Sequence, residues 1–97
     1  MYVAVRRYEV KPGSEDEIGR TVKEGFVPIV SKAPGFIAYY AISRDGFACS
    51  ISVFQNQAQA EESNRLAAGW VKTVGHLFPK APQVSAGEAR CYAGPKT

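Results

Sequence analysis

The pattern of hydrophobic and polar positions predicts a strand, a helix and a strand in the first half of the chain. β-Branched and aromatic residues predict a strand over residues 2–10. A helix then begins at Ser14, and Glu17 stands three places on, which is the capping-box spacing. We expect a kink near Pro28, because a proline ring denies one backbone hydrogen bond. Apolar residues follow at helical spacing: Ile18, Val22, Phe26 and Ile29.

The second half repeats this order after a tight hairpin. Residues 36–43 and 47–54 predict two antiparallel strands, joined through the Asp45-Gly46 pair that favours tight turns. A long helix is predicted from Asn56 to about Phe78 (residues 56–78). A last strand is predicted over residues 84–93. The stripe of that long helix consists of Ser63, Leu66, Ala67, Trp70, Val74 and Leu77.

The predicted order is β-α-β-β-α-β, which is that of the ferredoxin-like unit, an α+β fold. Right-handed crossovers and the short hairpin place the first and third strands in the centre of an antiparallel sheet. Both helices then lie on the same face of that sheet. We expect residues 1–97 to form a single domain.

The second strand is apolar on both of its faces, although two helices can cover only one. Strict alternation places Phe36, Ala38, Tyr40 and Ile42 on one face and Ile37, Tyr39 and Ala41 on the other. Strands that are buried on both faces read as continuous apolar runs. Burying a patch of several hundred Å² contributes roughly 5–10 kcal/mol. We therefore expect a homodimer in which the sheets of two copies meet face to face.

Composition excludes several classes of protein. Lys and Arg number 12 against 9 acidic residues, which gives a net charge of +3. These charges are scattered, so we expect no nucleic-acid partner. No stretch approaches the roughly 20 apolar residues of a membrane span, and no signal peptide is visible, so we expect a cytoplasmic protein with no membrane partner. Cys49 and Cys91 fall on strands about 9.6 Å apart, which is too far for a disulfide.

The chain resembles the dimeric α/β-barrel superfamily, and within it the antibiotic biosynthesis monooxygenase (ABM) group, over residues 2–93. The stretches that carry the resemblance are Tyr2 to Gly13, Val27-Pro28-Ile29-Val30, Pro34-Gly35-Phe36 and Ser52-Val53-Phe54. It implies a homodimer whose two sheets form a barrel, with a pocket in each subunit between sheet and helices. It also implies a cofactor-independent monooxygenase that acts on a small aromatic or phenolic substrate.

The resemblance suggests three candidate catalytic residues. Cofactor-free oxygenases of this group have a Trp on the second helix and an Arg on the last strand, and Trp70 and Arg90 occupy such places. His76 stands where those enzymes have a Tyr, and an imidazole is a common general base. Each residue also has a structural interpretation: packing for Trp70, a solvated rim for His76, and a pair with Glu88 for Arg90.

Candidate substrate-binding residues are Asn64, Tyr8 and Tyr39. Asn64 lies one to two helical turns before the Trp, and either tyrosine can place a hydroxyl in the pocket. Arg6 and Arg7 point to opposite faces of the first strand, and we expect each to form a structural pair.

Other functions remain open at this point. A non-catalytic or stress-related dimer that binds a small hydrophobic ligand is the main alternative. Haem-degrading relatives carry an Asn on the first strand, where this chain has Arg6 and Arg7. The RNA-recognition motif shares the element order, but Asp45 and Cys49 replace the basic and aromatic residues that hold phosphate and base. No His, Cys and carboxylate cluster has metal-ligand spacing, and we expect no cofactor.

Overall fold

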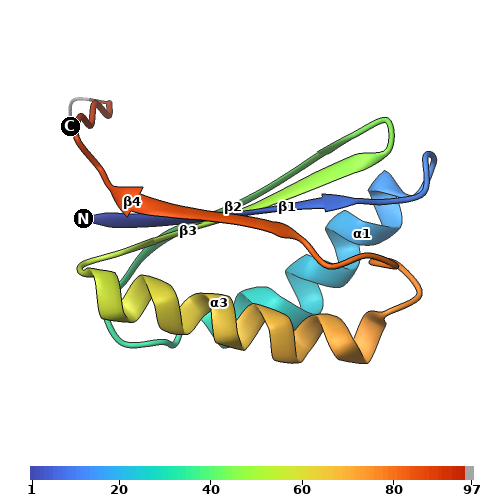
Figure 1. The fold of residues 1–97 in the computed structure, drawn as a ribbon, viewed down its shortest axis with the longest axis horizontal. Coiled ribbons are helices and arrows are strands. Elements are labelled where there is room, and N and C mark those ends of the chain that lie inside the picture. The colour runs from blue at the N-terminus through green and yellow to red at the C-terminus, as the bar shows by residue number, and fades with distance from the viewer. Residues whose placement is uncertain (96–97) are drawn as a thin grey trace.

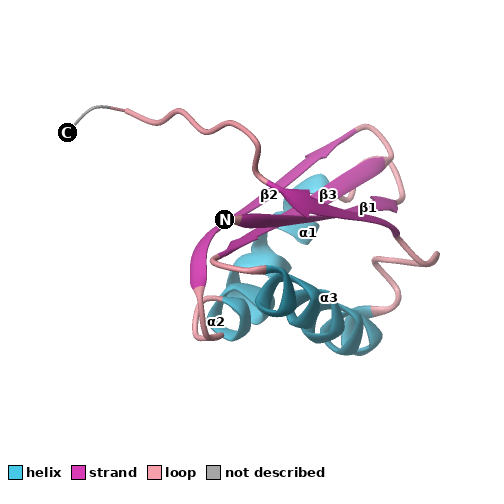
Figure 2. Ribbon diagram, turned by 60° about the vertical axis from the view of Figure 1, so that its left-hand side comes forward, coloured by secondary structure: helices cyan, strands magenta, loops and turns pink. Residues whose placement is uncertain are grey.

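The computed structural model describes residues 1–95 and contains a four-stranded antiparallel sheet in the order β2-β3-β1-β4. Helical segments pack on one face of this sheet (Figures 1 and 2). The α+β ferredoxin-like fold and the central place of β1 and β3 are therefore confirmed. The elements are β1 (Tyr2–Glu9), α1 (Glu15–Thr21), η1 (Val22–Phe26), α2 (Val27–Val30), β2 (Phe36–Arg44), β3 (Phe47–Phe54), α3 (Gln57–Val71), η2 (Lys72–Val74) and β4 (Gln83–Glu88).

The first helical segment is irregular in its middle. Between α1 and α2 the chain forms a π-helical stretch, η1, which ends two residues before Pro28. Pro28 has no N–H to donate to the carbonyl of Glu24, so the regular ladder is lost in the turn before the proline. Ser14 stands at the N-cap, but its hydroxyl donates to the Lys11 carbonyl at 2.6 Å, so the predicted capping box does not form.

A bulge corrects the predicted faces of β2. Phe36 is opposite Phe54 and Ala38 is opposite Val53, so Ile37 is an extra residue in the strand. Phe36 consequently shares the helix-covered face with Tyr39, and its ring meets that of Phe54 edge on at 5.9 Å. The prediction that Phe36 lies on the same face as Ala38 was wrong.

The last strand is shorter than predicted. β4 ends at Glu88, and the backbone N–H of Ala89 makes a last hydrogen bond to the Met1 carbonyl at 2.9 Å. β4 pairs only with β1, which begins at Tyr2, so later residues have no strand beside them. Cys91 therefore lies beyond the sheet, in an exposed segment that runs away from it (Figure 2), and both cysteines are free. Residues 96–97 of the predicted domain lie outside the described residues.

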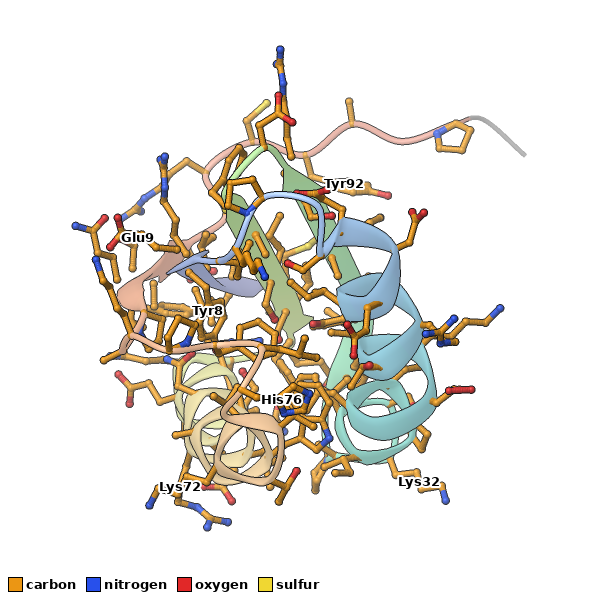
Figure 3. All side chains as sticks on the ribbon, turned by 90° about the vertical axis from the view of Figure 1, so that its right-hand side faces the viewer. Tyr8, Glu9, Lys32, Lys72, His76 and Tyr92 are labelled. Carbon is orange, nitrogen blue, oxygen red and sulfur yellow. The ribbon has the colours of Figure 1, made fainter. Side chains whose placement is uncertain are left out.

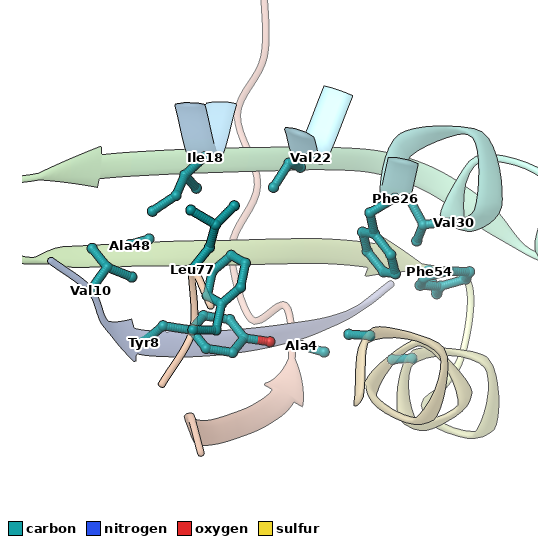
Figure 4. Packing of buried hydrophobic residues seen from close by; sticks show 13 residues of the cluster. Ala4, Tyr8, Val10, Ile18, Val22, Phe26, Val30, Ala48, Phe54 and Leu77 are labelled. Carbon is teal, nitrogen blue, oxygen red and sulfur yellow. The ribbon is translucent and has the colours of Figure 1, made fainter. Parts of the chain in front are cut away.

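The core fills the layer between the sheet and the helices (Figure 4). Its buried apolar residues are Ala4, Tyr8, Val10, Ile18, Val22, Phe26, Val30, Ala48, Phe54, Ala60, Ala67, Leu77 and Phe78. The opposite face of the sheet, called here the open face, is covered by no other element of the described residues. Tyr40 and Ile42 stand there with 60% and 53% of their surface exposed. Arg7 also lies on it, with its guanidinium 4.9 Å from the ring centre of Phe47.

Within the described residues, the structure contains no helix with the length and hydropathy needed to cross a membrane.

Candidate functional site

Arg6 is the one buried charged residue among residues 1–95. It lies in the middle of β1, and its exposed fraction is 1%. Strand alternation puts it on the same face as Ala4 and Tyr8, toward the helices. The neighbours of Arg6 in the sheet are Ser50 on β3 and Val84 on β4. The sheet therefore holds a guanidinium group where a core side chain is expected.

Four neutral oxygen atoms accept hydrogen bonds from this guanidinium. Nη1 donates to Asn64 Oδ1 at 2.7 Å and to Ser63 Oγ at 3.4 Å. Nη2 donates to Ser52 Oγ at 2.6 Å and to Ser50 Oγ at 2.9 Å. Nε is buried and has no partner, and no ion pair of the described residues involves this arginine. The cation is therefore held by dipoles and lacks a counter-charge.

Two tyrosines stand beside the arginine as neutral phenols. The hydroxyl of Tyr39 shares a hydrogen bond of 2.7 Å with Ser50 Oγ. Burial raises the pKa of Tyr8 and of Tyr39, and the charge of Arg6 opposes that rise. Burial lowers the pKa of Arg6, but arginine remains protonated at neutral pH. Neither phenol is therefore an anion that compensates the guanidinium.

Aromatic rings surround this polar group. The ring of Phe26 lies 5.5 Å from those of both Tyr39 and Trp70, measured between centroids. Phe78 lies 4.8 Å from Tyr8 and 6.2 Å from Trp70. These tilted and edge-on arrangements are the favourable ones for aromatic pairs. The result is a rigid aromatic cluster between the sheet and the helices.

Two hollows adjoin the cluster and share Tyr8 and Phe78. The first, called here the inner cavity, has a volume of about 40 Å³ and is lined mainly by apolar side chains, including Phe26, Tyr39 and Trp70. A cavity of this size holds one or two waters at most. The second, called here the edge groove, measures about 300 Å³, which is the lower end of the range for ligand pockets.

The edge groove lies between β1, α3 and the segment that leads to β4. Its polar lining residues are Arg6, Asn64, Lys72 and Lys80. No carboxylate is among its lining residues in the described part of the chain. Lys80 forms an ion pair of 3.3 Å with Glu9, so that charge is compensated at the rim. The groove is therefore positive at its base and at the end of α3.

Four of the predicted site residues come together here. Trp70 and Tyr39 line the inner cavity, Asn64 lines the edge groove, and Tyr8 lines both. Asn64 also holds Arg6 in place through its amide oxygen. The structure thus brings one candidate catalytic residue and all three candidate substrate-binding residues to one place.

His76 and Arg90 lie elsewhere. The long helix ends at Val74, so His76 lies in the turn that follows, rather than within the predicted helix (Figure 3). The side chain of His76 is 71% exposed, and Nε2 lies 4.0 Å from Glu17 Oε2. Arg90 is exposed two residues beyond β4, so its predicted place on the last strand was wrong. The carboxylate of Glu88 pairs instead with the N-terminal amine of Met1 at 3.4 Å.

The sequence interpretation did not identify Arg6 and its serines as a site. The available signal was a charged residue at position 6, between inward-facing Ala4 and Tyr8 of β1; Arg6 is opposite Ser50 on β3, and Ala4 is opposite Ser52. In the structure these hydroxyls make room for the guanidinium and bind it.

In the described residues, no group of three His, Cys, Asp or Glu side chains is placed to hold a metal ion.

Comparison with known families gives one match. The family described as antibiotic biosynthesis monooxygenase matches residues 1–68 of the chain. No curated protein matches it.

Several solved structures have a similar fold. A protein of unknown function, NE2512 from Nitrosomonas europaea, is 18% identical, with a TM-score of 0.77 over 99% of this chain and 95% of that one. A putative antibiotic biosynthesis monooxygenase from Bordetella bronchiseptica is 19% identical, with a TM-score of 0.75 over 93% and 97% of the two chains. A monooxygenase from the gene ActVA-Orf6 of Streptomyces coelicolor, in complex with Nanaomycin D, is 16% identical, with a TM-score of 0.75 over 98% and 92%. At these identities the likeness concerns the fold.

Proposed function

The chain belongs to the antibiotic biosynthesis monooxygenase family, and on that premise we propose that it is a homodimeric, cofactor-independent oxygenase of a small aromatic or phenolic substrate. The observation that carries the proposal is the aromatic cluster around Trp70, which adjoins two hollows between sheet and helices. Flat rings such as Trp70 and Phe78 suit stacking or edge-on contact with an aromatic ligand. The fold alone would not indicate this chemistry, because one fold supports many functions.

The proposed reaction needs no external reductant. An anthrone-like phenol has a reactive methylene group between two rings, and its electrons reduce dioxygen. Two C–H bonds break, one C=O bond forms, and the second oxygen atom leaves as water with the two hydrogens. The protein contributes orientation and removal of water, which favour reaction of an electron-rich ring. The edge groove is the place for the ring, and the inner cavity is large enough for dioxygen.

The phenols of Tyr8 and Tyr39 supply the neutral donors of this pocket. Because burial raises the pKa of both, they keep their protons at neutral pH and can donate to a substrate oxygen. Tyr8 is the better placed of the two, because it lines both hollows. We assign to Tyr8 the orientation of the substrate oxygen and to Trp70 a wall of the inner cavity, where dioxygen is held next to the ring.

The open face of the sheet supports the homodimer. Exposed Tyr40 and Ile42 lie on this apolar surface. A two-fold axis covers this surface with the same surface of a second copy, so both residues are buried in both copies. Burial of apolar surface at ~25 cal/mol per Å² stabilises such a dimer. Members of this family are commonly dimeric.

Oxygen uptake tests the catalytic proposal. Purified protein is mixed with a panel of phenols that includes anthrone, in buffer with a chelator, and oxygen and product are both measured. Tyr8→Phe, which removes a donor to the substrate, and Trp70→Phe, which alters the wall of the inner cavity, are each expected to lower kcat/KM by about tenfold or more. Tyr92→Phe, in the exposed segment after β4, is the matched control and keeps the wild-type rate.

The candidates His76 and Arg90 are tested in the same assay. Both lie outside the residues that line the two hollows in the described part of the chain. His76→Ala and Arg90→Ala are therefore expected to retain activity within about threefold of wild type. Oxygen uptake no faster than the protein-free background across the panel would overturn the catalytic proposal.

A second function is favoured by the position of His76. The chain has one histidine, its side chain is 71% exposed in a turn, and in the described residues it lines neither hollow. Without that imidazole, the two hollows have phenols, an amide, a guanidinium and two lysine amines as their main polar groups, which suit binding better than proton abstraction. A dimer that binds an aromatic ligand without converting it is the function that remains if oxygen uptake fails while binding persists.

A further inference from the structure

The guanidinium of Arg6 has more positive charge than its surroundings compensate. Its five N–H groups include four that donate to neutral oxygens and one, on Nε, that has no partner in the described residues. We infer that the edge groove binds an aromatic carboxylic acid, with the carboxylate directed toward Arg6 and the ring against Tyr8 and Phe78.

The energetics of burial favour a ligand with a negative charge. A buried cation loses its hydration, and hydroxyl dipoles return only part of that free energy. Buried arginines ordinarily gain the remainder from a carboxylate, but no ion pair of the described residues involves Arg6. An apolar side chain of similar volume would fill the same place without this cost. A bound anion supplies the interaction that the subunit does not.

The charges around the groove point the same way. Lys72, labelled in Figure 3, lines it from the end of α3 and forms no ion pair among the described residues, whereas Lys80 is paired with Glu9. The groove therefore has two uncompensated cations, one buried and one at the surface. Such an arrangement attracts an anion from solution and retains it where the dielectric is low.

The shape and chemistry of the groove select a carboxylate on an aromatic ring. Its volume of about 300 Å³ accommodates a ligand of one or two rings, and most of its lining is apolar. Phe78 and Tyr8 form an aromatic pair 4.8 Å apart at its wall. A carboxylate is ionised at neutral pH, and one of its oxygens can accept a charge-assisted hydrogen bond from the Nε–H of Arg6, the donor that has no partner in the described residues. A phosphate has three terminal oxygens, for which the single free donor of Arg6 is a poor match.

The inference deepens the proposed function, on which it rests for the aromatic part of the ligand. Its test measures binding in the absence of oxygen, so that turnover does not contribute. If the acid binds but no oxygen uptake follows when oxygen is admitted, the binding inference is sustained and the proposed oxygenase activity is overturned. If neutral phenols are oxidised and acids bind no more tightly than neutral ligands, the oxygenase activity is supported and the binding inference is overturned.

Calorimetry with matched probes provides the test. The probes are 1-hydroxy-2-naphthoate, its neutral amide 1-hydroxy-2-naphthamide, and inorganic phosphate. The acid is expected to bind wild-type protein about tenfold more tightly than the amide, as a charge-assisted hydrogen bond provides. Raising the salt concentration should weaken binding of the acid and leave the affinity for the amide unchanged. Quenching of Trp70, the only tryptophan, gives a second readout near the groove.

Three variants locate the effect. Arg6→Gln is expected to lower affinity for the acid about tenfold and to leave the amide within about twofold. Lys72→Gln, at an exposed position, should lower affinity for the acid about two- to threefold. Arg7→Gln is the matched control, because this arginine lies on the open face, and it should bind both probes as wild type does.

The outcomes decide the inference even if Arg6→Gln fails to fold. Equal affinity of wild-type protein for acid and amide would overturn it, as would an acid affinity that Lys72→Gln leaves unchanged at low salt. Tighter binding of phosphate than of the acid would overturn the assignment to an aromatic carboxylate. Preference for the acid that Lys72→Gln reduces about two- to threefold and Arg7→Gln leaves unchanged would sustain it.

Discussion

The indole of Trp70 lies directly against Gly25 of η1, with Nε1 2.6 Å from the position that a Cβ atom on Gly25 would occupy. Three ring atoms of the indole fall within 3.0 Å of that position. The absence of a side chain at Gly25 is thus what lets α3 and the first helical segment approach across the aromatic cluster. The π-helical stretch places Phe26 next to this contact, with its ring 5.5 Å from the indole.

Gly25→Ala is expected to destabilise the protein. The new methyl group meets a large ring that is packed on both sides, so overpacking costs about 1–3 kcal/mol, against roughly 1 kcal/mol gained from helix propensity. A net loss of about 1 kcal/mol in the free energy of unfolding should appear in urea denaturation, together with a shift in tryptophan fluorescence. Displacement of Trp70 should also reduce ligand binding or turnover.

Gly19→Ala is the matched control for that change. A Cβ atom on Gly19 meets nothing within 4 Å, and the residue lies in the regular part of the same helical segment. This substitution is expected to stabilise the protein by about 0.5–1 kcal/mol, because alanine lowers the backbone entropy of the unfolded chain. Equal effects of the two substitutions would show that the indole does not press on Gly25.

Much of the fold could be predicted because its signals are local. The third strand was predicted over residues 47–54 and is observed over the same residues, since a turn pair and a change of residue type bound it on both sides. The end of β4 could not be found this way. Val84 to Ala93 contains no Pro, Asn or Asp that would mark an earlier end, but the strand stops where β1 offers no further backbone, and that depends on pairing distant in sequence.

The site was predicted in its apolar part and missed in its charged part. Trp70, Tyr8 and Tyr39 stand at inward positions of their elements, so periodicity alone places them near one another. Alternation also separates Arg6 from Arg7, but it does not reveal which of the two faces the helices. Nor does it reveal that four neutral oxygens, from β3 and α3, surround the inward guanidinium.

Asn56 is predicted to stabilise α3 as its N-cap. Its extended backbone precedes the first turn, and its Oδ1 accepts a hydrogen bond from the Gln59 backbone N–H at 3.0 Å. Asn56→Ala should lower the free energy of unfolding by about 1 kcal/mol, because that donor loses its partner. Asn56→Asp keeps the acceptor and serves as the control in the same thermal or urea denaturation. An alanine variant as stable as wild type would contradict a capping role.

Stability is expected to fall at alkaline pH because of Tyr8 and Tyr39. Burial raises the pKa of both above the ordinary value of 10.0, so the native state holds protons that the unfolded chain releases. Above about pH 10 the unfolded state binds fewer protons than the native state, and the free energy of unfolding decreases with pH. Below that pH the contribution of both phenols is fully present.

Urea denaturation at a series of pH values from about 8 to about 11 measures this effect. Substituting both Tyr8 and Tyr39 by Phe should make the decrease above about pH 10 shallower, whatever its effect at neutral pH. Tyr92→Phe, at a position 71% exposed, is the control and should follow the wild-type curve. A double variant whose stability falls as steeply as that of wild type would show that other groups cause the alkaline loss.

The open face of the sheet predicts how the dimer can be separated. Ile42 on β2 is 53% exposed in the subunit, and the proposed interface covers it. Wild-type protein should sediment at twice the chain mass of 10.5 kDa. Ile42→Lys places a charge in the interface, where burial without a partner costs several kcal/mol, and should sediment as a single chain.

Ile29→Lys provides the comparison that makes this prediction specific. Ile29 is 41% exposed, so the two positions present similar apolar surface, but Ile29 lies on α2, in the helical layer rather than on the open face. A general effect of added charge on solubility would change both variants alike, whereas a sheet-to-sheet interface responds only at Ile42. If the wild type sediments as a monomer at micromolar concentrations, or if the two variants dissociate equally, the open face is not the dimer interface.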